Sequence, residues 1–338
     1  MLKKTSLFIL GGAVGIIFVL IFSTILYPFI ASRGKTYEAV RLAVEFNNHA
    51  APAYIAKHFN WFSEEGLNVT TFNSYVTGVA LANALARGDV DAAYICLGPA
   101  LLSYSRGVDI VIVAGTHFHG YSIVSTEEIT TPRQLEGRKV GVVEVGSNAD
   151  ILFNLAIDKY GLDKGKIDIR RGNPPLLITL LLTKQLDAIV VPEHWATLAA
   201  SSKGFHVLLR SQDIWPEMQG SVLIVKRELL EKKPEIVEKL VKITEKGIDY
   251  IENNRNEAAK ILLEELSKAS PLGVEPDLIS KTSQLLSLEI IRKSMDNLDY
   301  NVELNSSSIE KYIETLYKLG YIEKTFNVSK VVDKHFIG

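Results

Sequence analysis

The chain has 338 residues, enough for about two average domains with sizeable cores. Hydrophobic residues make up 47% and charged residues 22%, which excludes a disordered or collagen-like chain. Lys and Arg total 37 against 39 Asp and Glu, so the net charge of −2 offers no basic excess and no nucleic-acid partner is expected. The single cysteine excludes an intrachain disulfide and any metal site built from several cysteines.

Residues 1–35 are predicted to form a membrane anchor or signal segment. Residues 7–30 carry no charge and follow Lys3 and Lys4. As a helix they would extend about 36 Å, enough to cross a hydrocarbon core of about 30 Å. The run is longer than the hydrophobic part of a cleaved signal, which usually has about 7–15 residues. It therefore favours a single uncleaved anchor with the body of the chain on the extracytoplasmic face. Cleavage near Ala31, giving a secreted or periplasmic protein, stays open.

From residue 37 onward, short β-branched runs alternate with amphipathic helices in two rounds. The first round predicts strands at 40–46, 68–72, 90–97 and 110–115, with helices from Pro52 to Gly66, at 79–87 and at 98–106. The second predicts strands at 138–143, 167–170 and 188–191, with helices at 149–160, 176–183 and 193–201. This alternation implies an α/β fold with mixed, mostly parallel sheets flanked by helices.

The last third of the chain has a different character. Charged amphipathic helices are predicted at 234–253, 256–265, 276–288 and 308–319. Their Lys and Glu runs are most simply solvated faces with i,i+4 pairing. No chemistry is expected there, and the segment is predicted to pack on the α/β part.

Several motifs in a fixed order resemble one family of binding proteins. Residues 52–54, 61–69 and 85–93 look like the opening third of the periplasmic solute-binding proteins for sulfonates, taurine, nitrate and pyrimidine thiamine precursors. Residues 135–142, 146–148, 186–188 and 233–237 are similar to later parts of the same group. The resemblance runs from about residue 37 to the C-terminus.

The resemblance implies a two-lobed, hinged, type II periplasmic-binding fold that hands a small solute to the permease and ATPase of an ABC importer. Lobe 1 would comprise residues 36–117 and 219–338, and lobe 2 residues 118–218. The chain would cross between lobes near 115–120 and 215–221, and the helical tail would return to lobe 1. One departure is that Pro192-Glu193-His194 stands where family members often carry a Glu-Pro pair.

Five loops follow predicted strands, where ligands bind in open α/β sheets. They are 47–52, 73–78, 97–100, 144–148 and 192–195, with the crossing at 116–119 beside them. The helix start at 146–148 is the best candidate, although Ser and Asn also suit a plain N-cap there. The ligand-binding candidates are Asn47, His49, Ser74, Thr77, Gly98, Thr116, Glu144, Ser147, Asn148, Glu193 and Trp195. Trp195 suits stacking on a solute and a core position equally well.

The charge of these loops bears on the solute. None of the five contains Arg or Lys, which a sulfonate or phosphate usually recruits. Glu45, Glu144 and Glu193 lie in or beside them instead. The pattern favours an amine or another donor, such as a pyrimidine, over a bare sulfonate, although solvent-facing glutamates would explain it too.

Other classes of function have less support. His49, His117, His119 and His194 are scattered over three loops and complete no known metal-binding spacing, so no metal or cofactor is expected. Gly146-Ser147 lacks the pattern of a nucleophile elbow, and Cys96 reads as a small hydrophobe after a buried strand, so catalysis is not expected. The alternative function is a membrane-anchored ligand-sensing ectodomain that uses the same clamp without an importer.

Overall fold

The computed structural model describes residues 38–337. The predicted segment 1–35 therefore lies outside the described residues. From Ala39 onward the chain forms one compact unit. None of the helices in the described part is long and apolar enough to cross a membrane.

The first sheet has five strands in the order β2 (Leu67–Tyr75), β1 (Glu38–Glu45), β3 (Ala92–Cys96), β11 (Ser221–Lys226) and β4 (Ile110–Gly115). β1 runs parallel to β3, whereas β11 runs antiparallel to both of its neighbours. Every residue of β3 and β4 is buried, as expected of strands covered on both faces. The order β2-β1-β3-β11-β4 places the carboxyl ends of β1 and β3 side by side.

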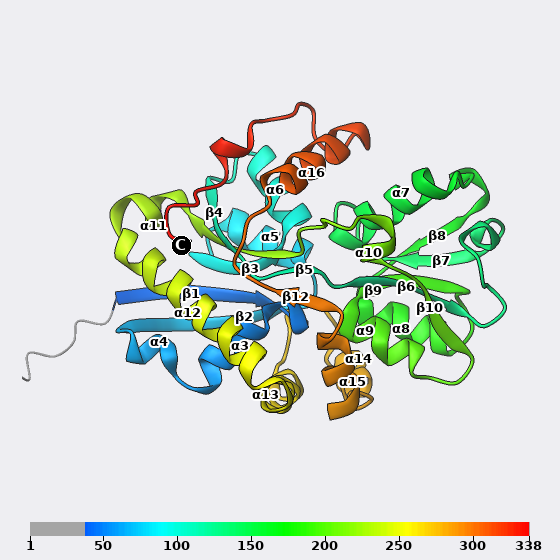
Figure 1. Ribbon diagram of the computed structural model, residues 1–338, viewed down its shortest axis with the longest axis horizontal. Helices are drawn as coiled ribbons and strands as arrows, with labels where there is room; N and C mark the ends of the chain where they lie inside the picture. The colour runs from blue at the N-terminus through cyan, green and yellow to red at the C-terminus, as the bar shows by residue number, and fades with distance from the viewer. Residues whose placement is uncertain (1–37, 338) are drawn as a thin grey trace, which may run out of the picture. The chain divides into compact units, whose positions relative to one another are not determined.

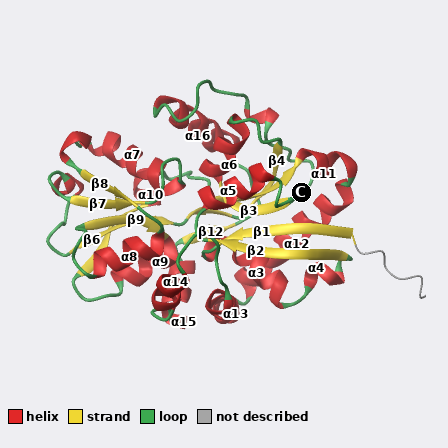
Figure 2. Cartoon of the chain, turned by 180° about the vertical axis from the view of Figure 1, so that it is seen from behind, coloured by secondary structure: helices red, strands yellow, loops and turns green. Residues whose placement is uncertain are grey.

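The second sheet also has five strands, in the order β10 (Phe205–Arg210), β6 (Tyr121–Thr126), β9 (Ala188–Pro192), β7 (Lys139–Val142) and β8 (Asp168–Arg171). β7 runs parallel to β8 and β9, and β6 runs antiparallel to β9 and β10. Each sheet is thus mixed, with one strand reversed between two neighbours, and helices flank both sheets (Figures 1 and 2).

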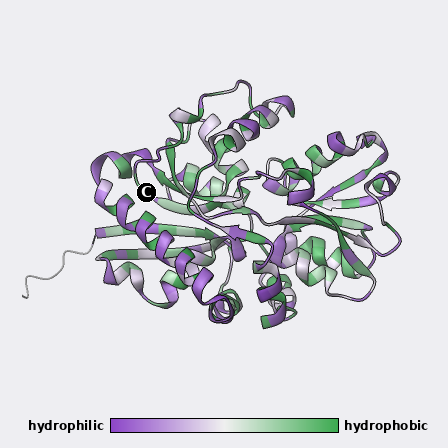
Figure 3. Ribbon diagram, viewed as in Figure 1, coloured by the Kyte–Doolittle hydropathy of each residue, from purple (hydrophilic) through white to green (hydrophobic). Residues whose placement is uncertain are grey.

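Two groups of helices surround the sheets. Those packed around the first sheet are α3 (Ala51–His58), α4 (Trp61–Glu64), α5 (Gly78–Arg87), α6 (Leu97–Ser105), α11 (Arg227–Lys232), α12 (Pro234–Asn253), α13 (Arg255–Lys268) and α16 (Ser306–Lys318). Those around the second sheet are α7 (Asn148–Tyr160), α8 (Pro174–Leu182), α9 (Glu193–Ala200) and α10 (Ser211–Ile214). We call the first sheet with its helices the first half, and the second sheet with its helices the second half. The hydropathy colouring shows apolar residues in the interior of both halves and many polar residues on the outer helices (Figure 3).

Local sequence signals fix several helix ends. Thr77 and Ser147 are the N-caps of α5 and α7, and each side chain accepts a hydrogen bond from a backbone amide in the first turn. Gly88 and Gly161 end the same two helices in the left-handed conformation, with φ of 83° and 61°. These four residues explain why both helices have nearly the predicted bounds.

The chain passes between the halves twice and then bridges them again. It leaves the first sheet after Gly115 and returns at Ser221. The short strand β12 (Leu298–Tyr300) pairs with β5 (His117–His119) in the first of these crossings. The helices α14 (Pro276–Ser283) and α15 (Leu288–Met295) pack on α8 and α9 of the second half (Figure 1). The tail therefore contacts both halves.

Candidate functional site

A small cavity lies between the two halves, at the carboxyl ends of their parallel strands. The first half contributes the ends of β1 and β3 and the starts of α5 and α6; the second contributes the start of β6, the end of β9 and the starts of α7 and α8. Its lining residues are Glu45, Thr77, Gly78, Cys96, Pro99, Tyr121, Val143, Ser147, Asn148, Ala149, Pro174 and Pro192. The cavity volume is about 10 Å³, the room of about one water molecule. The halves are therefore in a closed arrangement.

Asn148 connects the halves across this cavity. Its side-chain Oδ1 accepts a hydrogen bond from the Gly98 amide at 2.7 Å, and its Nδ2 donates to the Gly220 carbonyl at 3.1 Å. Gly98 belongs to the start of α6, and Gly220 to the return crossing. A single buried side chain of α7 therefore holds two segments of the first half.

The first amides of α6 all bind oxygens of the protein itself. The Cys96 amide donates to Glu45 Oε2 at 3.0 Å, the Leu97 amide to the Gly220 carbonyl at 3.1 Å, and the Gly98 amide to Asn148. Pro99 comes next and has no amide hydrogen. In the closed arrangement this helix start offers no free donor to an oxyanion.

Glu45 presents a buried carboxyl group to the cavity. Burial raises its pKa, and the negative charge of Glu144 raises it further, whereas hydrogen bonds from Cys96 and from the Gly78 amide act in the opposite direction. Cys96 Sγ and the Tyr121 hydroxyl lie 2.6 Å apart beside it. Burial also raises the pKa of the Cys96 thiol well above its ordinary value, so this thiol is a poor nucleophile at neutral pH.

Four predicted residues are brought together at the cavity. Thr77, Ser147 and Asn148 line it, and Gly98, which is not itself a lining residue, donates its amide to Asn148. Thr77 Oγ1 also accepts from the Ala80 amide, and Ser147 Oγ from the Asp150 amide, both at 3.2 Å. The hydroxyls of Thr77 and Ser147 therefore both cap a helix and line the cavity.

The other predicted residues lie outside the lining, and most of them have structural partners. Asn47 caps the 3-10 turn Asn48–Ala50, and the His49 ring donates to the Gly120 carbonyl at 2.8 Å. The Ser74 hydroxyl lies 3.1 Å from that of Tyr54. Thr116 is fully buried, and its hydroxyl has no partner among residues 38–337.

Three more predictions fall on the second half. Glu193 binds Ser122, Thr197, Arg210 and Asn297, so its carboxylate is committed to an internal network. Trp195 is fully buried against Phe46 and His194 and stacks on no open surface. Glu144 is partly buried, and burial raises its pKa.

Three of the four predicted histidines, His49, His117 and His194, are buried. The rings of His49 and His117 lie 4.3 Å apart. His117 Nε2 accepts from the Ser221 amide and Nδ1 donates to the Phe118 carbonyl, each at 3.1 Å, which fixes a neutral tautomer. Neither ring nitrogen of His194 has a partner in the described part of the chain. Within that part, no three His, Cys, Asp or Glu side chains are placed to hold a metal ion.

Sequence reasoning missed most of the cavity wall. It named Glu45 only as a neighbour of the first loop, and it did not select Tyr121, Val143, Pro174 or Pro192. Tyr121 opens strand β6, which was not predicted. Pro192 already belongs to the predicted loop 192–195, whereas Glu45, the last residue of β1, lies two residues before the predicted loop 47–52.

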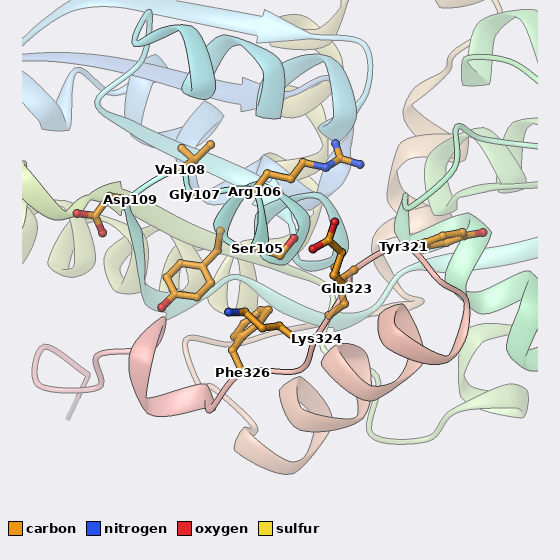
Figure 4. Close-up of a pocket in the computed structure, with 11 residues that line it drawn as sticks. Ser105, Arg106, Gly107, Val108, Asp109, Tyr321, Glu323, Lys324 and Phe326 are labelled. Atoms are coloured by element: carbon orange, nitrogen blue, oxygen red, sulfur yellow. The ribbon is translucent and has the colours of Figure 1, made fainter.

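A roomier pocket of about 880 Å³ lies on the first half, between the turn after α6 and residues 321–326. Figure 4 shows Tyr321 pointing away from the other labelled side chains, in agreement with its hydrogen bond to Asp150 Oδ2 at 2.7 Å. Exposed charges of both signs, Arg106, Asp109, Glu323 and Lys324, surround this pocket. It does not lie where strand ends from two sheets converge, so the cavity between the halves is the stronger candidate for a solute site.

Comparisons with known proteins agree with this architecture. The chain is 25% identical over 203 residues to the taurine-binding periplasmic protein of Escherichia coli (strain K12), a match that covers 59% of this chain and 62% of that protein. The ligand-binding component of an ABC-type import system from Staphylococcus aureus has a similar fold, with a TM-score of 0.74 and 15% identity over 88% of this chain and 97% of that one.

The periplasmic aliphatic sulphonate binding protein of Escherichia coli superposes with a TM-score of 0.71 and 17% identity, over 87% of this chain and 97% of that one. The fold is thus the α/β periplasmic-binding-protein fold with mixed sheets. Residues 33–263 match the model of the NMT1-like family, which confirms the resemblance seen in the sequence. The chain belongs to the NMT1-like family.

Proposed function

We propose that this chain is the extracytoplasmic solute-binding component of an ABC importer. It would capture a small polar solute between residues 36–117 with 219–338 on one side and 118–218 on the other, and deliver it unchanged to a permease driven by an ATPase. The relatives named for taurine, aliphatic sulphonate and ABC-type import support this class of function.

The observation that carries the proposal is the cavity between the halves. Its walls come from both halves, and its polar groups converge from strand ends and helix starts. Because the volume of about 10 Å³ holds no solute, capture requires the halves to separate and close again. Contacts made only in the closed arrangement, above all those of Asn148, would then set how strongly a solute favours closure.

We infer the location of the protein from its sequence. The uncharged run 7–30 behind Lys3 and Lys4 supports a single membrane anchor, with the binding part on the extracytoplasmic side. A tether of this kind would keep the clamp near its permease.

Solute capture can be tested on the whole chain with two matched variants. Compounds retained after native purification are identified by mass spectrometry and titrated back while tryptophan fluorescence is recorded. Trp195 is a suitable reporter because its ring lies 6.2 Å from that of Phe46, which follows β1 of the first half. We expect a saturable change in the unmodified chain.

Asn148→Ala should weaken binding at least tenfold, since it removes the two hydrogen bonds that Asn148 makes across the cavity. Asn154→Ala is the control: it is buried in the same helix but bonds to Asp150 and Lys164, away from the cavity. Equal losses in both variants, or no saturable change with any retained compound, would contradict solute capture at this site.

A further inference from the structure

The described residues include four buried carboxylates, and three of them have a basic partner. Asp150 pairs with Arg171 at 2.6 Å, Glu193 with Arg210 at 2.7 Å, and Glu265 with Lys57. A buried carboxylate is costly unless it is paired, hydrogen-bonded or neutralised. In all three cases a basic side chain of the protein compensates the buried negative charge.

Glu45 is the exception. Its side chain forms no ion pair with any Lys, Arg or His of residues 38–337, although the residue is buried, with only 5% of its surface exposed. It is also the only one of the four that lines the cavity between the halves. The unpaired carboxylate thus coincides with the candidate solute site.

The surroundings of Glu45 disfavour a second anion. Its carboxylate takes the Cys96 amide and a hydrogen bond from the Gly78 amide, so it already occupies the starts of α5 and α6, where an oxyanion would be attracted. No Arg or Lys is present among the lining residues. An oxyanion placed here would meet a carboxylate and no compensating cation.

We propose that the solute carries a cationic nitrogen, an ammonium or amidinium group, that binds Glu45. This inference rests on the proposed function and names its substrate class. The hydroxyls of Thr77 and Ser147 and the amide of Asn148 would bind the polar remainder, and Pro99, Pro174 and Pro192 would contact an apolar body. The solute's charge would complete the pairing that Asp150, Glu193 and Glu265 obtain from the protein.

The test uses pairs of compounds that differ only in the nitrogen group. Taurine is compared with isethionate, and ethanolamine with ethylene glycol, because in each pair a hydroxyl replaces the ammonium group; nitrate and ethanesulfonate are the plain oxyanions. Isothermal titration of the whole chain should show the amine-bearing member of at least one pair binding at least tenfold more tightly. Glu45→Gln should reduce that ratio at least tenfold.

Glu265→Gln is the control, because it also neutralises a buried glutamate but lies outside the cavity lining. It should leave the ratio unchanged. The ratio in the unmodified chain remains decisive even if Glu45→Gln fails to fold. Binding of nitrate or ethanesulfonate without binding of either amine would overturn the inference and leave solute capture standing. Absence of binding by every compound would contradict the proposed function, and the inference with it.

Discussion

At the scale of single residues, the interface between the halves contains neutral histidines that water does not reach. Burial lowers the pKa of His49 and of His194 from 6.5 to about 3, and the pKa of His117 well below its ordinary value. His194 packs between Phe46 and Trp195 and has no polar partner within residues 38–337. Its imidazole therefore acts as an apolar ring, and a proton would be accepted only after the site opens.

The substitution His194→Phe tests, through the pH dependence of stability, whether His194 is neutral in the folded protein. Between pH 6.5 and about 3 the unfolded chain binds a proton at His194 that the folded chain does not, so the free energy of unfolding falls as the pH falls through that window. From pH 8 to pH 5, one such histidine lowers it by about 2 kcal/mol. The variant should lose about 2 kcal/mol less than the unmodified chain over that range, measured by urea unfolding.

The glutamates of raised pKa, Glu45, Glu144 and Glu193, act in the opposite direction above pH 4.5, but they are common to both proteins and cancel in the difference. The same loss in both proteins would show that His194 already holds its proton, or reaches water, in the folded state.

Residue roles that depend on neighbours in sequence could be predicted, and those that depend on distant contacts could not. Ser147 and Thr77 stand just before helices, so their caps follow from local patterns. The position of Glu45 depends on the Cys96 amide, 51 residues away in the chain. Only the fold brings those two groups together, so the sequence by itself predicts this carboxylate only as a neighbour of the site.

At the scale of elements, closure brings the start of α6 against the start of α7. A methyl group on Gly98 would lie 2.8 Å from Ile151 Cδ1 and 2.9 Å from the Gly146 carbonyl oxygen, closer than real side chains approach. Gly98 therefore lets the two helix starts meet.

Gly98→Ala should destabilise the closed arrangement, because its methyl group would clash with residues of the second half. Overpacking of this kind costs about 1–3 kcal/mol, so solute affinity should fall about 5- to 160-fold, as measured by titration calorimetry. Gly165→Ala is the control, since its methyl group would meet only the Asp163 side chain at 3.3 Å, on the surface of the second half. Unchanged affinity in Gly98→Ala would show that this contact is absent from the solute-bound form.

The elements that sequence reasoning found are those with their own start and stop signals. The strand at 110–115 and the helix at 234–253 have the predicted bounds. Strands β6, β10 and β11 were missed, and two of them are the reversed strands, whose identity depends on pairing with neighbours on both sides. Two predicted helices are divided, one at Asn60 with φ of 60° and the other where Ser287 starts α15.

At the scale of the whole molecule, the tail joins the two halves. α14 and α15 pack on α8 and α9, and Tyr321 of the last segment binds Asp150 of α7. These links cross from one half to the other outside the two main crossings. Opening must therefore bend or release these links. They limit how far the halves separate, and they contribute to the free-energy difference between the open and closed arrangements. A shift from mostly open to mostly closed requires about 5.5 kcal/mol of differential solute affinity.

The most direct test of the clamp is small-angle X-ray scattering of the whole chain at several solute concentrations. The chain without solute should sample a more extended arrangement than the closed one. A solute shown to bind by calorimetry should reduce the radius of gyration toward that of the closed structure, along the same saturation curve as the heat of binding. A radius of gyration that stays constant while the heat of binding saturates would contradict the account, because the solute would then bind without closing the two halves.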